Sequence, residues 1–342
     1  MALPELCILD VGHGNAAVIH AADGVVIVDA PLGLTLIELL VARAINVIDT
    51  IIVSHADSDH VQGVTSILLD ERFIVRTVLV NPDATKDNKT WNDFRRALAV
   101  AKARYELQVS RNLGSDYPTI AFGATRVEIV GPSHTLALSG PGGNELPEHG
   151  GRSISSNSLS AVVRVSHDNV SRALLTGDLD AVGLADLERC AVDLGAELLV
   201  FPHHGGHASQ GDNAQFTDRL CRSVGATTVV FSLGRGKHST PRPEIIRAVE
   251  TALPTPHIAC TQLSARCATV NPNVERAHRV VAPAQGLERN TICAGTLVQE
   301  LATGRISPDR DAHAAFVRTN APTHLCLGGA LSSKGADDAE TR

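Results

Sequence analysis

The chain has 342 residues, a net charge of −7, and 44% hydrophobic residues of which few are aromatic. This length allows one large domain or two smaller ones, with a core of mainly aliphatic side chains. The acidic balance argues against a protein that grips nucleic acid with its whole surface, because neutralising phosphates requires clustered Lys and Arg. The seven cysteines form no CxxC pair, which argues against a disulfide framework.

The start of the chain resembles neither a secretory signal nor a membrane anchor. No basic segment precedes a longer apolar stretch, and no run approaches the roughly 18 apolar residues that a membrane span needs. We therefore expect a cytoplasmic protein with reduced thiols and no membrane partner. Cys260, Cys267, Cys293 and His278 lack the paired spacing of a zinc site, and the thiols are expected to be buried and free.

Short strands and helices are expected to alternate along the chain. Residues 5–30 are predicted to form a β meander, followed by a helix over 35–46, a strand over 51–53 and helices over 61–69 and 91–105. Later strands are expected over 126–130, 159–165, 173–176, 198–201 and 228–232, and helices over 181–193, 213–224 and 243–252. Periodicity alone predicts only an α/β protein.

A long segment rich in Gly, Pro and Ser, residues 131–156, interrupts this alternation. Loops of this length are typically functional or disordered. We interpret the segment either as a mobile flap, with His149 and Arg152 contacting substrate, or as a surface insertion.

We divide the chain into three parts. Residues 1–270 are expected to form the main domain, and residues 271–305 an extension with a closing strand over 290–301. Residues 306–342 end in a Gly-, Ser- and charge-rich stretch and are expected to be a flexible tail.

The most informative segment is His55-Ala56-Asp57-Ser58-Asp59-His60, which follows the apolar strand at 50–53. A strand delivers side chains to an open edge at its carboxyl end, so the turn can direct all four ligand-type residues toward one or two ions. Imidazole and carboxylate together suit Zn²⁺, Mn²⁺ or Fe, whereas structural zinc sites favour thiolates. The segment therefore predicts a metal site.

This spacing resembles the HxHxDH signature of the metallo-β-lactamase superfamily, here in the form HxDxDH. Other landmarks of the superfamily follow the predicted strands in the expected order: Asp29, Asp178 and the pair His203-His204. The resemblance implies a four-layer αββα sandwich of two mixed β-sheets flanked by helices. It also implies two divalent ions as cofactors.

Three further segments resemble the ComEC/Rec2 subgroup, the hydrolase domain of DNA-uptake channel proteins. Residues 10–15, with His13 at their centre, resemble its DVGQGD opening. Asn157-Ser158-Leu159 resembles its NxSL segment, and residues 236–244, including Lys237 and His238, resemble its GHPSPE segment.

The resemblance implies a role for each matched residue. We assign His55 and Asp57 to one ion, Asp59 and His60 to the other, and Asp178 as the bridge between them. One of His203 and His204 is expected to bind the second ion. Asp29 is expected to orient a ligand or the signature turn, and His238 to bind phosphate or protonate the leaving group. Asp59, His238 and Asp29 are the expected catalytic residues, and His13, Asn157, Ser158, Lys237 and His238 the expected substrate contacts.

Two departures from the family pattern affect the metal. Asp57 replaces the second histidine of the signature, and Asn157-Ser158 stands where a further histidine is expected. The resulting oxygen-rich site favours Mn²⁺ or a weakly held Zn²⁺.

These features predict a metal-dependent nuclease or phosphodiesterase that cleaves DNA with a metal-activated water. Two alternatives stay open: a hydrolase of small phosphodiesters or esters, such as a cyclic nucleotide, a phosphocholine ester or a lactone, and a noncatalytic partner-binding module. Two basic clusters could contact a nucleic acid: Arg95, Arg96, Lys102 and Arg104 on one predicted helix, and Arg235, Lys237 and Arg242 around His238.

Overall fold

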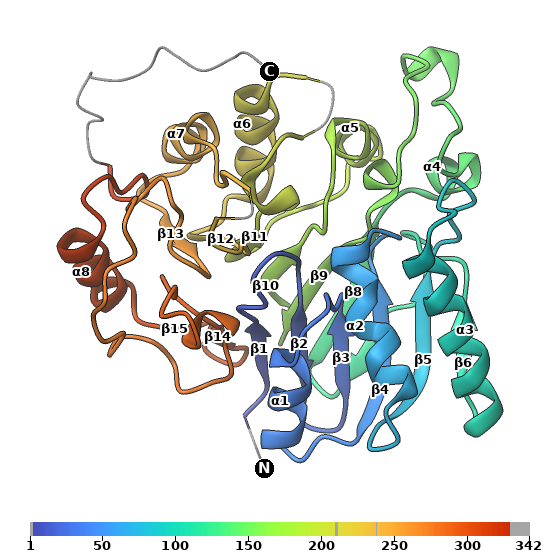
Figure 1. Ribbon diagram of the computed structural model, residues 1–342. Helices are drawn as coiled ribbons and strands as arrows, with labels where there is room; N and C mark the ends of the chain where they lie inside the picture. Colours follow the sequence, from blue (N-terminus) through green and yellow to red (C-terminus); the bar gives the residue numbers. More distant parts are fainter. Residues whose placement is uncertain (1–2, 209–210, 237, 329–342) are drawn as a thin grey trace.

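The computed structural model describes residues 3–208, 211–236 and 238–328, which form two facing β-sheets (Figure 1). The first sheet has eight strands, of which β3 to β6 run parallel and the others antiparallel to their neighbours. Across the sheet they are β15 (Ile306–Ser307), β14 (Leu297–Glu300), β1 (Glu5–Ile8), β2 (Ala17–His20), β3 (Val25–Val28), β4 (Val47–Val53), β5 (Ile74–Val80) and β6 (Gln108–Ser110).

The second sheet has seven strands, with a parallel half from β10 to β13 and an antiparallel half from β7 to β10. Across the sheet they are β13 (His257–Cys260), β12 (Thr228–Phe231), β11 (Leu198–Val200), β10 (Val170–Leu175), β9 (Val162–His167), β8 (Thr125–Gly131) and β7 (Ile120–Phe122). Each sheet therefore has one edge region where parallel strands end together.

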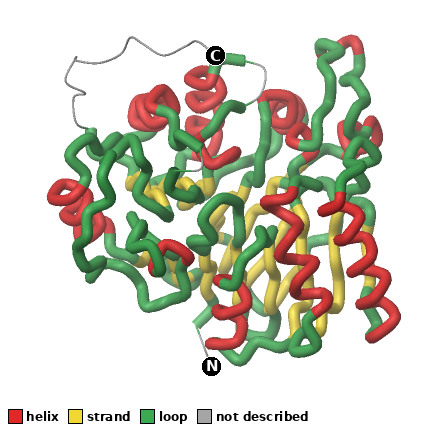
Figure 2. The backbone as a smooth tube through the Cα atoms, in the orientation of Figure 1, coloured by secondary structure: helices red, strands yellow, loops and turns green. Residues whose placement is uncertain are grey.

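The described residues contain eight α-helices. Figure 2 shows the helices in red around the yellow strands of the sheets. They are α1 (Thr35–Ala42), α2 (Ser58–Leu69), α3 (Lys89–Arg104), α4 (His134–Ser139), α5 (Ala181–Arg189), α6 (Asn213–Val224), α7 (Pro243–Ala252) and α8 (Arg310–Asn320). Short 3₁₀ turns are η1 (Pro147–His149), η2 (Asn157–Leu159), η3 (Pro202–Gly205) and η4 (Gln285–Leu287). None of the helices in the described part is long and apolar enough to cross a membrane.

Three apolar cores separate the layers. Side chains of a strand alternate between its faces, so Ile51 of β4 packs with Leu39 of α1 and Phe94 of α3, whereas Ile52 points into the core between the sheets, with Leu175 of β10. A third core joins the second sheet to α5, α6, α7 and α8. The four-layer αββα sandwich expected from the resemblance is confirmed.

The segment from 131 to 156 contains α4 and η1 and packs against the domain. Ile154 is buried in a small apolar cluster that it shares with Val182 of α5. Arg152 forms an ion pair of 2.6 Å with Glu145, whose carboxylate is buried. Arg152 is therefore engaged within its own segment.

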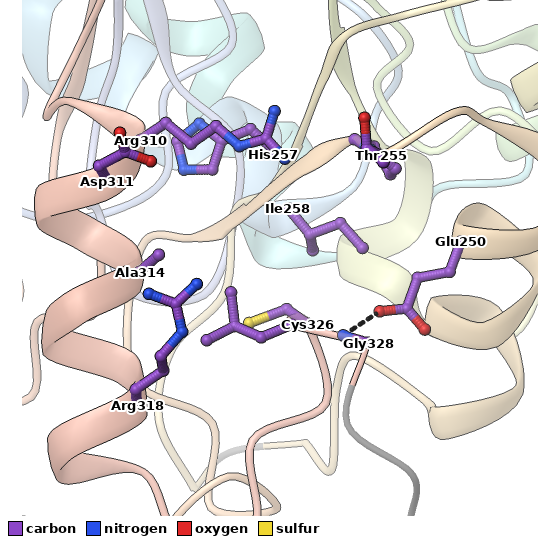
Figure 3. Close-up of a pocket in the computed structure, with 12 residues that line it drawn as sticks. Glu250, Thr255, His257, Ile258, Arg310, Asp311, Ala314, Arg318, Cys326 and Gly328 are labelled. Carbon is purple, nitrogen blue, oxygen red and sulfur yellow. Dashed lines mark hydrogen bonds between the residues drawn. The ribbon is translucent and has the colours of Figure 1, made fainter.

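Residues 306–328 of the expected flexible tail are folded onto the domain, and residues 329–342 lie outside the described part. Phe316 of α8 is buried in the core that α6 and α7 share. Figure 3 shows Arg310, Ala314 and Arg318 of α8 facing Glu250 of α7 across a cavity. The volume of this cavity is about 700 Å³. Glu250 accepts a hydrogen bond of 2.9 Å from the Gly328 N–H, which fixes the chain beyond α8.

Two buried histidines, one in α8 and one in the neighbouring strand β13, predict loss of stability in mild acid. Nε2 of His257 in β13 lies 3.1 Å from Nδ1 of His313 in α8. Burial lowers the pKa of His257 to about 4 and that of His313 to about 3, from an ordinary value of 6.5. At a pH below 6.5 but above these folded-state pKa values, only the unfolded state binds the protons. The free energy of unfolding should therefore decrease as the pH is lowered, by about 2 kcal/mol per histidine at pH 5 relative to neutral pH. Urea unfolding at pH 7 and pH 5 measures this loss.

A His313→Gln protein should lose clearly less stability than the wild type between these two pH values. The matched control is His134→Gln, which changes a histidine whose side chain is 57% exposed and should leave the pH dependence unchanged. Equal pH dependence in all three proteins would contradict the assignment.

Candidate metal centre

The predicted site residues meet where parallel strands of both sheets end. Asp29 follows β3, the signature at 55–60 follows β4 and leads into α2, and Asp178 follows β10. His203 and His204 follow β11 in η3. The carboxyl ends of parallel strands are the usual position of a binding site in open α/β sheets. Each sheet supplies part of this one.

Two groups of side chains could each hold a metal ion. The inner group is His55, His60 and Asp178, all buried, and the outer group is His13, Asp59 and His204. Asp178 reaches both groups, because its Oδ1 lies 3.4 Å from His60 Nε2 and 3.8 Å from His204 Nε2. Its Oδ2 lies 3.8 Å from His55 Nε2. The arrangement is consistent with a dinuclear centre.

Four buried atoms at this centre have no hydrogen-bond partner within the described part of the chain. They are Nε2 of His55, Nε2 of His60, Nε2 of His204 and Oδ1 of Asp178. Burying polar atoms without partners is costly. Imidazole nitrogen and carboxylate oxygen are donors that Zn²⁺ and Mn²⁺ accept. The residues present therefore fit divalent ions.

The opposite nitrogen of two ligand-type rings is held by the protein. His60 Nδ1 lies 2.7 Å from Asp29 Oδ2, and His204 Nδ1 lies 2.8 Å from the carbonyl oxygen of Ser232. Such contacts favour the tautomer that leaves Nε2 as a lone-pair donor to a metal. Asp29 thus lies behind the ligand-type histidines, where it orients the ring of His60. Its side chain does not reach the cavity that opens over the outer group.

The carboxylates at the centre are held ionised by the imidazoles around them. Burial alone would raise the pKa of Asp178, but His60, His204 and His203 outweigh it and hold that pKa well below its usual range. Burial opposes ionisation of Asp59 too, but the nearby imidazoles of His13 and His204 outweigh it and hold the pKa of Asp59 well below its usual range. Both carboxylates are therefore ionised at neutral pH and can act as charged metal ligands.

Three residues of the centre have left-handed backbone conformations. The φ angle is 59° at Asp29, 55° at His203 and 56° at His204. These angles are uncommon outside glycine and cost energy that the surrounding structure must supply. Consecutive left-handed residues turn the two histidines differently: His204 Nε2 joins the outer group, whereas His203 Nδ1 lies 3.0 Å from Asp178 Oδ2.

A cavity of about 430 Å³ opens over the outer group. Its lining includes Asp59, Asp178, His204, His238 and Arg242. The His13 ring lies between two others, 4.6 Å from the ring of His204 and 4.4 Å from that of His238. A bound molecule would therefore face the ligand-type carboxylates on one side and His238 with Arg242 on another.

The structure groups the ligand-type residues differently from the sequence assignment. His60 lies with His55 and Asp178, whereas Asp59 lies 3.1 Å from His13 Nε2 and shares the outer group with His13 and His204. Asp57 belongs to neither group. The reason is that α2 begins at Ser58, so Asp59 and His60 leave the first helical turn in different directions.

The expected substrate contacts separate into three kinds. His13 and His238 line the cavity. Asn157 Nδ2 lies 3.3 Å from His203 Nε2, so it contacts the rim through that ring. Ser158 is buried and donates a hydrogen bond of 2.7 Å to Asp180, because η2 turns its side chain inward, away from the cavity. Lys237 lies outside the described residues.

Sequence reasoning missed two residues at the centre. Ser54 donates to Asp29 Oδ2 at 2.7 Å, and its Oγ lies 3.0 Å from His55 Nδ1. Its position before His55 was an available signal. Lys86, in the loop after β5, forms an ion pair with Asp57. No sequence pattern singles out that lysine, because the ion pair joins the loop after β5 to the turn after β4.

The two expected basic clusters are largely engaged within the protein. Arg235 donates to the carbonyl oxygens of Leu263 and Ala268, at 2.7 and 2.6 Å. Arg242 pairs with Glu244. In α3, Arg96 pairs with Asp93 and Arg104 donates to the carbonyl oxygen of Leu69.

Comparison with solved structures finds similar proteins of low sequence identity. YhfI of Bacillus subtilis, a metallo-beta-lactamase fold protein, is 12% identical with a TM-score of 0.44, over 75% of this chain and 96% of that one. Igni18, a metallo hydrolase of Ignicoccus hospitalis, is 14% identical with a TM-score of 0.39, over 72% and 91%. A diphosphatase of the PhnP family is 13% identical with a TM-score of 0.40, over 72% and 81%.

No curated protein matches the chain. The sequence model of the metallo-beta-lactamase superfamily matches residues 9–219, which is more than half of the chain and includes the inner and outer groups. The chain therefore belongs to the metallo-beta-lactamase superfamily and is a metal-dependent hydrolase of that fold.

Proposed function

We propose that this hydrolase is a phosphodiesterase and that its substrate is DNA. The observation that carries the proposal is the pairing of two His/Asp groups with His238 and Arg242 around one cavity. A phosphodiester is anionic, so divalent ions together with an imidazole and a guanidinium suit it. The resemblance of residues 10–15, 157–159 and 236–244 to the ComEC/Rec2 subgroup supports DNA as the polymer.

The protein's own residues have distinct tasks in this proposal. The inner and outer groups would hold two divalent ions, Zn²⁺ or Mn²⁺, which supply activation of a water for hydrolysis when bound. Asp178 keeps the two groups together, and Asp29 holds His60 in the orientation that ligation needs. His238, on the cavity wall, binds a phosphoryl oxygen or gives a proton to the leaving oxygen.

Cleavage of labelled single- and double-stranded DNA by metal-stripped protein, after addition of Mn²⁺ or Zn²⁺, tests this proposal. We expect cleavage that requires the metal and that falls at least 100-fold in an Asp59→Ala protein, because the outer group loses its carboxylate. The control is Asp93→Ala, which removes a partly exposed carboxylate of α3. Cleavage unaffected by Asp59→Ala would point to a contaminating nuclease and contradict the proposal.

A second candidate is hydrolysis of small phosphodiesters or esters. The observation that favours it is that Arg235 and Arg104 donate hydrogen bonds to backbone carbonyls of the protein, which leaves few described cations outside the cavity to bind a long polyanion. The cavity of about 430 Å³ also falls in the size range of small-molecule sites. Metal uptake without DNA cleavage, together with turnover of a cyclic nucleotide or a phosphocholine ester, would favour this candidate.

A further inference from the structure

The two carboxylate oxygens of Asp57 have different partners. Oδ2 lies 3.6 Å from His55 Nε2, one of the buried ring atoms without a hydrogen bond. Oδ1 forms an ion pair with the ammonium group of Lys86. One oxygen therefore faces the inner group while the other is occupied by a cation of the protein.

The loop that carries Lys86 is held by hydrogen bonds within itself and to two other segments of the chain. The carboxylate of Asp83 accepts hydrogen bonds of 2.8 and 2.6 Å from the backbone N–H and the hydroxyl of Thr85. The same carboxylate accepts from Ser156, directly before η2. At the start of the loop, Asn81 accepts a hydrogen bond of 2.8 Å from the Leu113 N–H. The backbone beneath Lys86 is thus held in place.

Lys86 also compensates a charge. A carboxylate at position 57 adds a negative charge that a neutral histidine would not bring. The pKa of Asp57 is lowered to about 2, since contacts with His55 and Lys86 outweigh a burial effect that would raise it. Within the described residues, no other Lys or Arg forms an ion pair with Asp57, Asp59 or Asp178.

We propose that Lys86 is a positioning residue of the metal centre: it holds Asp57 by Oδ1, with Oδ2 turned toward the inner group as a fourth donor to the inner ion. This inference rests on the metal centre of the proposed function but not on its substrate. Partners that hold a metal ligand in place typically contribute 10- to 100-fold to metal affinity. Without Lys86, Asp57 can rotate toward solvent, because its side chain is 31% exposed.

Titration of metal-stripped protein with Mn²⁺ or Zn²⁺ alone, by calorimetry or chelator competition, tests the inference without any substrate. We expect Lys86→Met to weaken the binding of one ion by about 10-fold or more and to leave the other unchanged. Lys86→Arg, which keeps the positive charge, should restore affinity to within about 3-fold of the wild type. The matched control is Lys89→Met, which removes a lysine of α3 that is 89% exposed and pairs with Asp93.

A double-mutant cycle then asks whether Lys86 acts through Asp57. Asp57→Asn should weaken the same ion, and adding Lys86→Met to it should cause little further loss. Metal-free urea unfolding verifies that each variant is folded. Unchanged or tighter binding in Lys86→Met would overturn the inference, the latter because it would make Lys86 a competitor of the metal. A wild-type protein that binds no divalent ion would overturn the proposed function as well.

Discussion

An Asp178→Asn protein is expected to bind divalent ions more than 100-fold more weakly than the wild type. Asp178 is the carboxylate that reaches both groups, with His60 Nε2 3.4 Å and His204 Nε2 3.8 Å from the same oxygen. Asparagine fills the same volume but has no charge, and its NH₂ group cannot bind a metal. The loss should exceed the 10- to 100-fold that removing an outer-shell partner costs. Chelator competition with Zn²⁺ and Mn²⁺ measures it.

Asp186→Asn is the matched control. Asp186 is a buried carboxylate of α5 that accepts hydrogen bonds of 2.9 and 2.8 Å from Ser133, and it belongs to neither metal group. This change is expected to lower the free energy of unfolding while leaving metal affinity as it is. If Asp178→Asn bound both ions as the wild type does, the dinuclear arrangement described above would be wrong.

Gly63→Ala is expected to destabilise the protein by about 2 kcal/mol, although alanine is the better helix former by about 1 kcal/mol. A Cβ atom at this position of α2 would lie 2.3 Å from the carbonyl oxygen of Pro31 and 3.0 Å from Ala30. The Gly63 N–H donates a hydrogen bond of 2.8 Å to the Ala30 carbonyl, so the helix cannot move away without losing it. Urea unfolding in the presence of chelator measures the change.

The same substitution should weaken metal binding, because the Ala30 N–H is hydrogen-bonded to the carbonyl oxygen of His60 at 2.8 Å. Displacing α2 away from the loop that follows β3 would therefore separate His60 from Asp29. Thr65→Ala, at a half-buried position of α2, is the control and should change stability by little. A Gly63→Ala protein more stable than the wild type would show that the loop accommodates the methyl group.

Local patterns accounted for most of the fold and for the ligand-type residues. The strand before His55 and the carboxylates that end β3 and β10 are features of short segments, which a sequence displays directly. The strand expected from residue 159 begins instead at Val162, because Asn157–Leu159 form η2. Strand ends are set by such turns, which periodicity does not detect.

The grouping of the ligand-type residues was not predictable in the same way. Which of Asp59 and His60 lies beside Asp178 depends on how α2 starts and on how the two sheets face each other. The role of Lys86 depends on the packing of two loops. The fold of α8 was missed because Phe316 and Val317 are the only large apolar residues of a charged segment, and their burial depends on α6 and α7.

The pairing of β1 with β14 matters while the protein is being synthesised. Leu6 stands opposite Gln299 in this ladder, so the 293 residues that follow Leu6, up to Gln299 (299 − 6), must be synthesised before one edge of β1 finds its partner. At about 5–20 residues per second this takes roughly 15 to 60 s. During that interval the backbone N–H and C=O groups of the edge are open to pairing with other chains. The growing chain is therefore expected to need chaperone protection that the finished protein does not.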